Sequence, residues 1–267
     1  SMFVITQLIG LAVIYFYTPT IIQQEINGTI QNVTVNPLPY GMEPPKDEAG
    51  ISLASIIIAF VIAILFILLL TKLKAALFMR IWFFSVVAIV LAITLNSVLQ
   101  FFSPYSTIIS LIISIPLAVF KIFKRNIIVH NLTELMIYPG IAVVFVPLLN
   151  IWTIILLLIL ISLYDMWAVW HTGFMQKMAK YQMEELKLFA GFFIPYLTKK
   201  QRAQIKEAKL KKSGKTKTMK VNLAILGGGD VVFPIITAGV VMRTFSSSTF
   251  LGVPGLLQAL IVVVCST

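Results

Sequence analysis

Two aspartates, Asp165 and Asp230, lie in segments that are otherwise apolar enough for the interior of a bilayer. Asp165 occurs within ILISLYDMWAVW and Asp230 within AILGGGDVVFP. An isolated aspartate at bilayer depth costs roughly 2.5–3.5 kcal/mol on insertion scales, so the pair costs about 5–7 kcal/mol. Acids inside a membrane are rarely kept without a use, and they mark functional sites. Asp165 and Asp230 are therefore the candidate catalytic residues.

Two neighbouring acids can hydrolyse an amide bond. At a separation of about 4 Å and an effective dielectric near 20, two carboxylates repel by about 4 kcal/mol, so one holds a proton while the other is ionised. The ionised member then activates water as a general base, and the protonated member donates its proton to the scissile carbonyl. Helical rise from the basic residues Lys177 and Lys220 puts Asp165 and Asp230 at similar depths, as this chemistry requires.

The same pair of acids could also bind a cation or relay protons, as in a transporter. The sequence shows no inverted repeat, no second glycine-broken helix in its first half, and no cluster of buried Asn or Gln near the acids. These observations favour hydrolysis, with transport as the alternative function. A non-catalytic membrane scaffold is a third class, but it leaves the two acids unexplained.

Three consecutive glycines, Gly227, Gly228 and Gly229, come directly before Asp230. Each glycine costs a helix about 1 kcal/mol relative to alanine, and Pro234 removes a further backbone donor. We therefore expect the apolar span that contains Asp230 to be loosened at this acid, with glycines that let a substrate backbone approach closely. The alternative is close helix packing through small residues.

The composition is that of a polytopic membrane protein. Hydrophobic residues make up 59% of the 267 residues, charged residues 12%, and the mean hydropathy is +0.97. The net charge of +11 comes from basic residues that flank apolar spans, which indicates topology and not nucleic-acid binding. The single cysteine, Cys265, and the absence of a His-Glu-x-x-His motif argue against a disulfide framework and a zinc site, so we predict no metal and no cofactor. The two histidines, His130 and His171, are expected to be boundary residues.

Eight apolar stretches are long enough to cross hydrocarbon as helices, which predicts an all-α, polytopic transmembrane helix bundle. They are Met2–Tyr17, Ile51–Thr71, Ala75–Leu99, Thr107–Phe120, Ile127–Leu149, Ile151–Trp170, Val221–Met242 and Phe250–Val264. If the amino terminus is cytoplasmic, nineteen of the 21 Lys and Arg residues fall on the cytoplasmic side, which predicts this orientation. Glu134 has Lys121 and two other basic residues nearby and is expected to snorkel or to form an ion pair.

We divide the chain into three parts: residues 1–170 with six spans and an outer loop at 18–50, residues 171–220, and residues 221–267 with two spans. The outer loop carries Pro37, Pro39, Pro44 and Pro45 and is expected to be irregular, with glycosylation sequons at Asn27 and Asn32. The cytoplasmic part 171–220 is expected to begin as a helix, to break at Pro195 and to continue as a basic linker that faces lipid.

Two motifs carry a resemblance to a known family. Tyr164-Asp165 and Gly227-Gly228-Gly229-Asp230 resemble the YD and GxGD motifs of presenilin-type intramembrane aspartyl proteases. Signal peptide peptidases share these motifs but resemble a bundle of inverted orientation, whereas the basic residues here place the long loop inside, as in presenilins. Prepilin peptidases typically carry a lysine where this chain has Val232. The chain therefore looks like an archaeal homologue of presenilin that acts without partner subunits.

The resemblance implies that Asp165 and Asp230 form a catalytic dyad that cuts transmembrane helices of other proteins. An amide inside a helix is shielded, so the substrate must unwind, and the segment TMKVNLAIL could offer it a strand. The expected substrate-binding residues are Tyr164, Val221, Leu223, Gly227, Gly228 and Gly229. The expected partners are transmembrane segments of substrates and membrane lipid, without nucleic acid, and a homo-oligomer is left open. The family has nine spans, the last with a Pro-Ala-Leu motif, to which Pro254-Gly255-Leu256 is a poor match.

Overall fold

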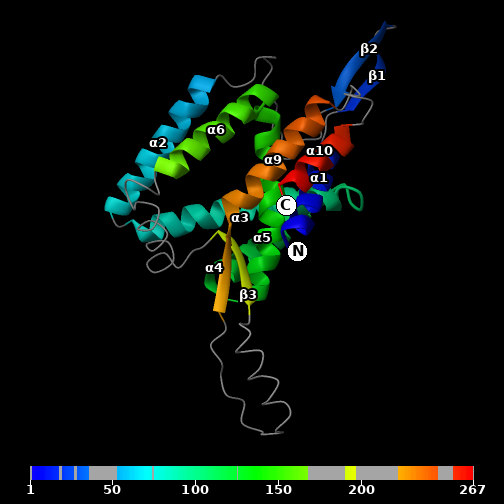
Figure 1. The fold of residues 1–267 in the computed structure, drawn as a ribbon. Helices are drawn as coiled ribbons and strands as arrows, with labels where there is room; N and C mark the ends of the chain where they lie inside the picture. Colours follow the sequence, from blue (N-terminus) through cyan, green and yellow to red (C-terminus); the bar gives the residue numbers. More distant parts are fainter. Residues whose placement is uncertain are drawn as a thin grey trace, which may run out of the picture.

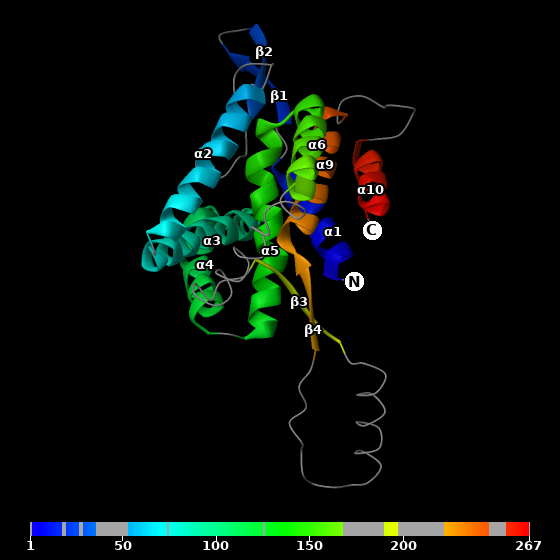
Figure 2. The same cartoon turned by 60° about the vertical axis from the view of Figure 1, so that its left-hand side comes forward.

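The computed structural model describes residues 2–17, 20–26, 29–35, 53–73, 75–124, 126–167, 190–196, 222–245 and 255–266. This part of the chain forms eight α-helices and two separate two-stranded sheets (Figures 1 and 2). The helices are α1 (Met2–Phe16), α2 (Leu53–Lys72), α3 (Ala76–Leu99), α4 (Ser106–Phe123), α5 (Ile127–Phe145), α6 (Ile151–Trp167), α9 (Gly228–Thr244) and α10 (Gly255–Cys265). The strands are β1 (Thr20–Ile26), β2 (Thr29–Val35), β3 (Gly191–Tyr196) and β4 (Asn222–Gly227).

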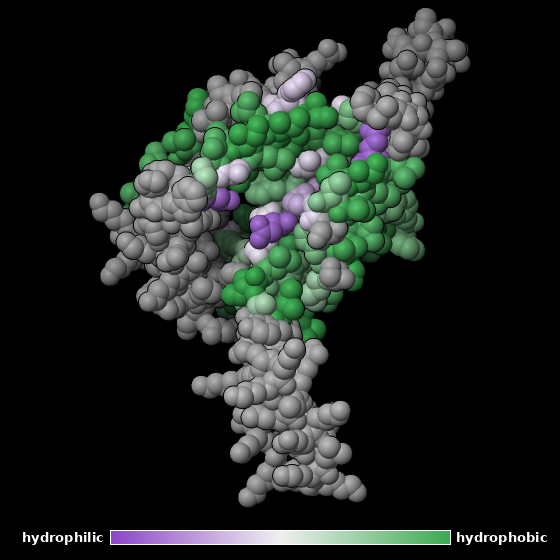
Figure 3. All heavy atoms as spheres, viewed as in Figure 1, coloured by the Kyte–Doolittle hydropathy of each residue, from purple (hydrophilic) through white to green (hydrophobic). Residues whose placement is uncertain are grey.

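Each described helix falls on one of the eight predicted spans. Within the described residues, three helical stretches are long and apolar enough to cross a membrane, namely Leu77–Leu99, Ser106–Phe123 and Ile127–Leu148. Met2–Phe16, Ile151–Met166 and Gly255–Cys265 are apolar but shorter. Many large apolar side chains are exposed on the outside of the bundle, and Figure 3 shows hydrophobic residues over most of the coloured surface in that view. Such a surface is suited to lipid and not to water.

Helix α5 lies at the centre of the bundle and packs against α1, α3, α4 and α9. One apolar cluster, which includes Leu11, Tyr138 and Ile235, joins α1, α5, α9 and α10. A second cluster, which includes Leu91 and Ala118, joins α3, α4 and α5. Because α5 contributes to both clusters, it connects the two halves of the bundle.

The predicted start of the seventh span is wrong. The span from Val221 was expected to be helical, whereas Asn222–Gly227 is the strand β4 and the helix begins only at Gly228. The strand suggested for the segment TMKVNLAIL is confirmed for its residues 222–226. The glycine run is a poor helix former, and β3 supplies backbone partners for the residues that precede it. The glycines were expected to loosen the interior of a helix. Instead, they mark the point where a strand becomes a helix.

Two loops predicted to lack sheet structure also contain strands. In the outer loop, β1 and β2 pair as an antiparallel hairpin from Thr20↔Val35 to Ile26↔Thr29. Asn32 lies in β2, whereas Asn27 lies outside the described residues. In the part 171–220, Gly191–Tyr196 is a strand that includes Pro195, so the predicted helix break at that proline is wrong. The division of the chain at residues 170 and 220 stays a prediction.

Candidate active site

The two candidate catalytic aspartates lie at the same end of a pair of packed helices. Helix α6 packs against α9, and the two run in opposite directions in both views of the fold (Figures 1 and 2). Asp165 is in the last turn of α6 and Asp230 in the first turn of α9. The height of Asp230 is thus set by where α9 begins, and not by helical rise from Lys220 as predicted.

Both aspartate side chains are exposed, so a substrate can reach them. Figure 3 shows a hollow in the apolar face with hydrophilic atoms beside it, over the region where the end of α6 and the start of α9 lie in Figure 1. Asp230 also lies among the first-turn backbone N–H groups of α9, which lack partners within the helix and favour a negative charge.

Gly227 and Gly228 lie in crowded surroundings, whereas Gly229 does not. A Cβ atom built on Gly227 would lie 3.0 Å from Oδ2 of Asp230, so the carboxylate lies against the end of β4. A Cβ on Gly228 would lie 3.1 Å from Oη of Tyr138, and one on Gly229 would make only ordinary contacts. The chain's own side chains therefore lie close to two of the three glycines, and the approach of a substrate backbone to them stays a prediction.

The other predicted substrate-binding residues are divided between the described and undescribed parts of the chain. Tyr164 precedes Asp165 in the last turn of α6 and is half-buried. Leu223 lies in β4, where its backbone is opposite Pro195 of β3. Val221 lies outside the described residues.

A buried glutamine of α1 lies next to the start of α9 and was not predicted. Gln7 donates a hydrogen bond from Nε2 to the carbonyl of Val231 at 2.9 Å, one residue after Asp230. Its side chain is fully buried. A single buried glutamine is not a cluster of amide side chains, so it leaves that part of the sequence analysis unchanged. The signal that could have revealed Gln7 is a lone Gln in an apolar span.

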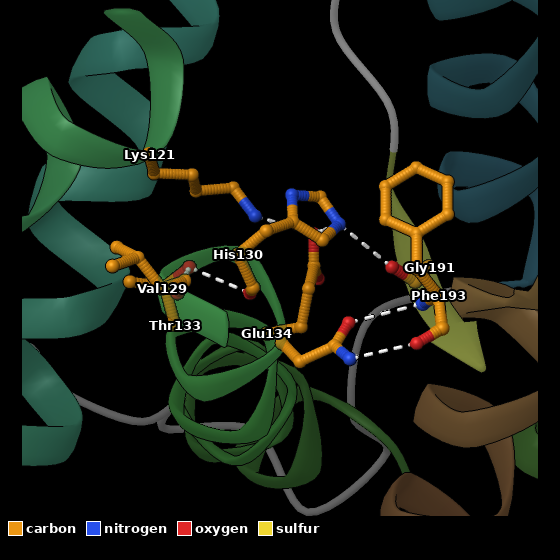
Figure 4. Close-up of polar contacts among 8 residues, drawn as sticks. Lys121, Val129, His130, Thr133, Glu134, Gly191 and Phe193 are labelled. Carbon is orange, nitrogen blue, oxygen red and sulfur yellow. Dashed lines mark hydrogen bonds and ion pairs between the residues drawn. The ribbon is translucent and has the colours of Figure 1, made fainter. Parts of the chain in front are cut away.

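A polar stripe on α5 faces β3 (Figure 4). Lys121 of α4 forms a buried ion pair with Glu134, as the sequence predicts, and Nε2 of His130 lies 3.6 Å from the same carboxylate. His130 lies in the first turn of α5, near a helix end as predicted, and its Nε2 also lies 2.8 Å from the carbonyl oxygen of Gly191. His171 lies outside the described residues. Asn131, which the sequence analysis missed, binds the backbone of Phe193. The signal for this stripe is the run His-Asn-x-x-Glu inside an apolar helix.

Among the residues that the structure describes, no group of three or more His, Cys, Asp or Glu side chains could hold a metal ion.

The ion pair between Lys121 and Glu134 provides a test of the stripe. Lys121→Met leaves the Glu134 carboxylate buried without its main partner, so we expect the free energy of unfolding to fall by about 3–5 kcal/mol. The double variant Lys121→Met/Glu134→Met replaces both charges with apolar groups, and we expect it to recover most of the loss. Unfolding in mixed detergent micelles measures both. A Lys121→Met variant as stable as the parent would contradict a structural role for the pair.

An apolar helical bundle that carries two lone carboxylates at one end of an antiparallel helix pair has the architecture of an intramembrane aspartic protease. The family model described as signal-peptide peptidase, presenilin aspartyl protease matches residues 29–265, and the chain therefore belongs to this family. It is an integral membrane protein and an intramembrane aspartic protease of the presenilin and signal-peptide-peptidase type, as predicted from the two motifs.

A comparison with solved structures supports the fold. The chain is similar to a presenilin family intramembrane aspartate protease, with a TM-score of 0.51 and 16% sequence identity over 97% of this chain and 80% of the other. At this identity the likeness shows the fold alone, and it confirms the predicted all-α polytopic bundle. No curated protein matches the chain.

Proposed function

We propose that the chain hydrolyses peptide bonds within transmembrane segments of substrate proteins, and that Asp165 and Asp230 are its catalytic dyad. The observation that carries this proposal is the position of both acids at the same end of the antiparallel pair of α6 and α9. The family of the chain supports the same reaction. Two exposed carboxylates in an apolar bundle have no structural use that would offset their cost in a bilayer.

The two acids act as a pair that shares one proton. The ionised member takes a proton from water as the general base, and the water oxygen adds to the carbonyl carbon of the scissile amide. The protonated member donates its proton to the carbonyl oxygen, which gives a tetrahedral diol. When the C–N bond of the resulting diol breaks, the nitrogen takes a proton from the dyad and a diol hydroxyl returns one to it.

Strand β4 is the proposed binding site for the unwound substrate. The amide groups of a substrate helix are hydrogen bonded internally, so local unwinding leaves them without partners in the membrane. An added strand restores these bonds by pairing along β4, and side chains near Leu223 contribute to the selection of the substrate. Because β4 runs directly into α9, a chain paired with it passes Gly227 and the Asp230 carboxylate.

We also propose that the amino terminus and the part 171–220 are cytoplasmic, because nineteen of the 21 basic residues then lie on that side. The β3–β4 sheet and the two aspartates would then lie toward the cytoplasmic side of the bundle. The basic residues of this part would contact the headgroups of anionic lipids.

Reconstitution distinguishes proteolysis from transport. The purified chain is placed in liposomes with a single-span substrate, and the products are identified by mass spectrometry. We expect cuts within the transmembrane segment, and inhibition by a peptide mimic of the tetrahedral diol, which resembles the transition state. Ion flux through the same liposomes without any cleavage would identify a transporter and contradict the proposal.

A further inference from the structure

The outer edge of β3 is occupied by side chains of α5. Asn131 donates a hydrogen bond from Nδ2 to the carbonyl oxygen of Phe193 at 2.8 Å and accepts one at Oδ1 from its N–H at 3.0 Å. Figure 4 shows this pair of bonds beside the contact between His130 and the carbonyl oxygen of Gly191. One carboxamide thus satisfies both backbone groups of a strand residue, as a neighbouring strand would.

These bonds reveal which backbone groups of the β3–β4 sheet point outward. In an antiparallel pair, opposed residues alternate between pairs that exchange hydrogen bonds and pairs that do not. Because Phe193 directs both its backbone groups to Asn131, the opposed residues Phe193 and Ile225 do not exchange hydrogen bonds with each other. The pairs Gly191↔Gly227 and Pro195↔Leu223, two residues away on either side, follow the same rule. Pro195 agrees with this pattern, since an outward position is one where a missing N–H does not weaken the sheet.

The same alternation leaves an open edge on β4. The backbone groups of Leu223 and Ile225 point away from β3, and no third strand lies beside β4 in the part of the chain that is described. Ile225 is 50% exposed. The two edges of the β3–β4 sheet therefore differ, because α5 covers the β3 edge, whereas no described segment pairs with the β4 edge.

We propose that Asn131, supported by His130, is a positioning residue that closes the β3 edge and fixes the β3–β4 sheet on α5. A substrate strand then adds only to β4, the strand that leads to Asp230. The substrate step of this inference rests on the proposed function. The closure of the edge by Asn131 does not, and it can be tested without cleavage.

The variant Asn131→Leu removes both bonds to Phe193, and Asn96→Leu is its matched control. Asn96 is 5% exposed and Asn131 is 6% exposed. Asn96 donates its hydrogen bond to Tyr17 and not to the β3–β4 sheet. We expect Asn131→Leu to raise hydrogen exchange of the amides in residues 191–196 at least about tenfold, and Asn96→Leu to leave them unchanged. Equal exchange in this segment for the two variants would overturn the inference even if the chain cleaves no substrate.

Cleavage gives a second readout that a loss of stability alone would not change. We expect Asn131→Leu to raise the KM about tenfold, equivalent to about 1.4 kcal/mol, and to spread the cut over several neighbouring bonds. Asn96→Leu is expected to cut at the same bond as the parent. A single unchanged cut position in Asn131→Leu would contradict the role in positioning.

Cysteine cross-linking tests the choice of edge with Asn131 intact, so it does not depend on the folding of that variant. In a Cys265→Ser background, Ile225→Cys in β4 is compared with Ile194→Cys in β3, two positions that are 50% and 41% exposed. A disulfide needs Cβ atoms about 3.5–4.5 Å apart, so only the strand adjacent to the substrate can form one. We expect a single-span substrate with one cysteine near its cut site to link to position 225. Linkage to position 194 in preference to 225 would overturn the inference.

Discussion

Asp165→Asn and Asp230→Asn are each expected to reduce cleavage of a single-span substrate to background, a loss of at least about 10²–10⁴-fold. An amide cannot take a proton from water or return one to the leaving nitrogen, so neither half of the reaction is complete with one acid. Because the two acids act as a unit, the double variant is expected to lose little more than either single variant. Product formation over a fixed time, measured in liposomes, compares the four proteins.

The fold is expected to survive both substitutions. The two aspartate side chains are exposed, so an amide in either position leaves no buried group without a partner. Ser162→Ala is the control, because Ser162 is an exposed polar residue about one turn before Asp165 in α6. We expect it to cleave as the parent does. Undiminished cleavage in either asparagine variant, with an unchanged thermal unfolding curve, would exclude that aspartate from the dyad.

Gly227→Ala is expected to lower kcat by about 10²-fold while the thermal stability stays close to that of the parent. The new methyl carbon would lie 3.0 Å from Oδ2 and 3.7 Å from Cγ of Asp230, so the carboxylate must move by a few tenths of an ångström. The rate of the reaction falls strongly when a catalytic group is displaced from the position in which it reacts. The backbone of Gly227, with φ of −63° and ψ of 143°, is readily adopted by alanine, so the change adds no strain.

Gly229→Ala is the matched control for Gly227→Ala. Its methyl carbon would meet only the ring of Phe233, at 3.6 Å and 3.8 Å, which are ordinary contact distances. Both substitutions restrict the backbone at the same junction of strand and helix, but only the first displaces the carboxylate. Equal losses of kcat in the two variants would show that the junction must flex, and would contradict the explanation from the position of the carboxylate.

The helical spans and the two acids could be recognised from the sequence because both signals are local. A stretch of apolar residues long enough to cross hydrocarbon indicates a helix wherever it occurs, and an aspartate inside such a stretch carries its cost regardless of its neighbours. For this reason the boundaries of the third helix, predicted as Ala75–Leu99, agree with α3 at Ala76–Leu99. The motifs around Asp165 and Asp230 depend on adjacent residues only, and they identified the family correctly.

The tertiary structure decided whatever depends on residues far apart in the chain. Asn222–Gly227 has an apolar sequence that fits a helix or a strand, and it becomes β4 because β3, a segment about thirty residues earlier, offers matching backbone groups. The polar residues of α5 acquired their meaning in the same way, since Asn131 is an isolated amide until Phe193 lies beside it. Hydrogen bonds between distant segments leave no periodic trace in the sequence, whereas the length and polarity of a membrane helix do.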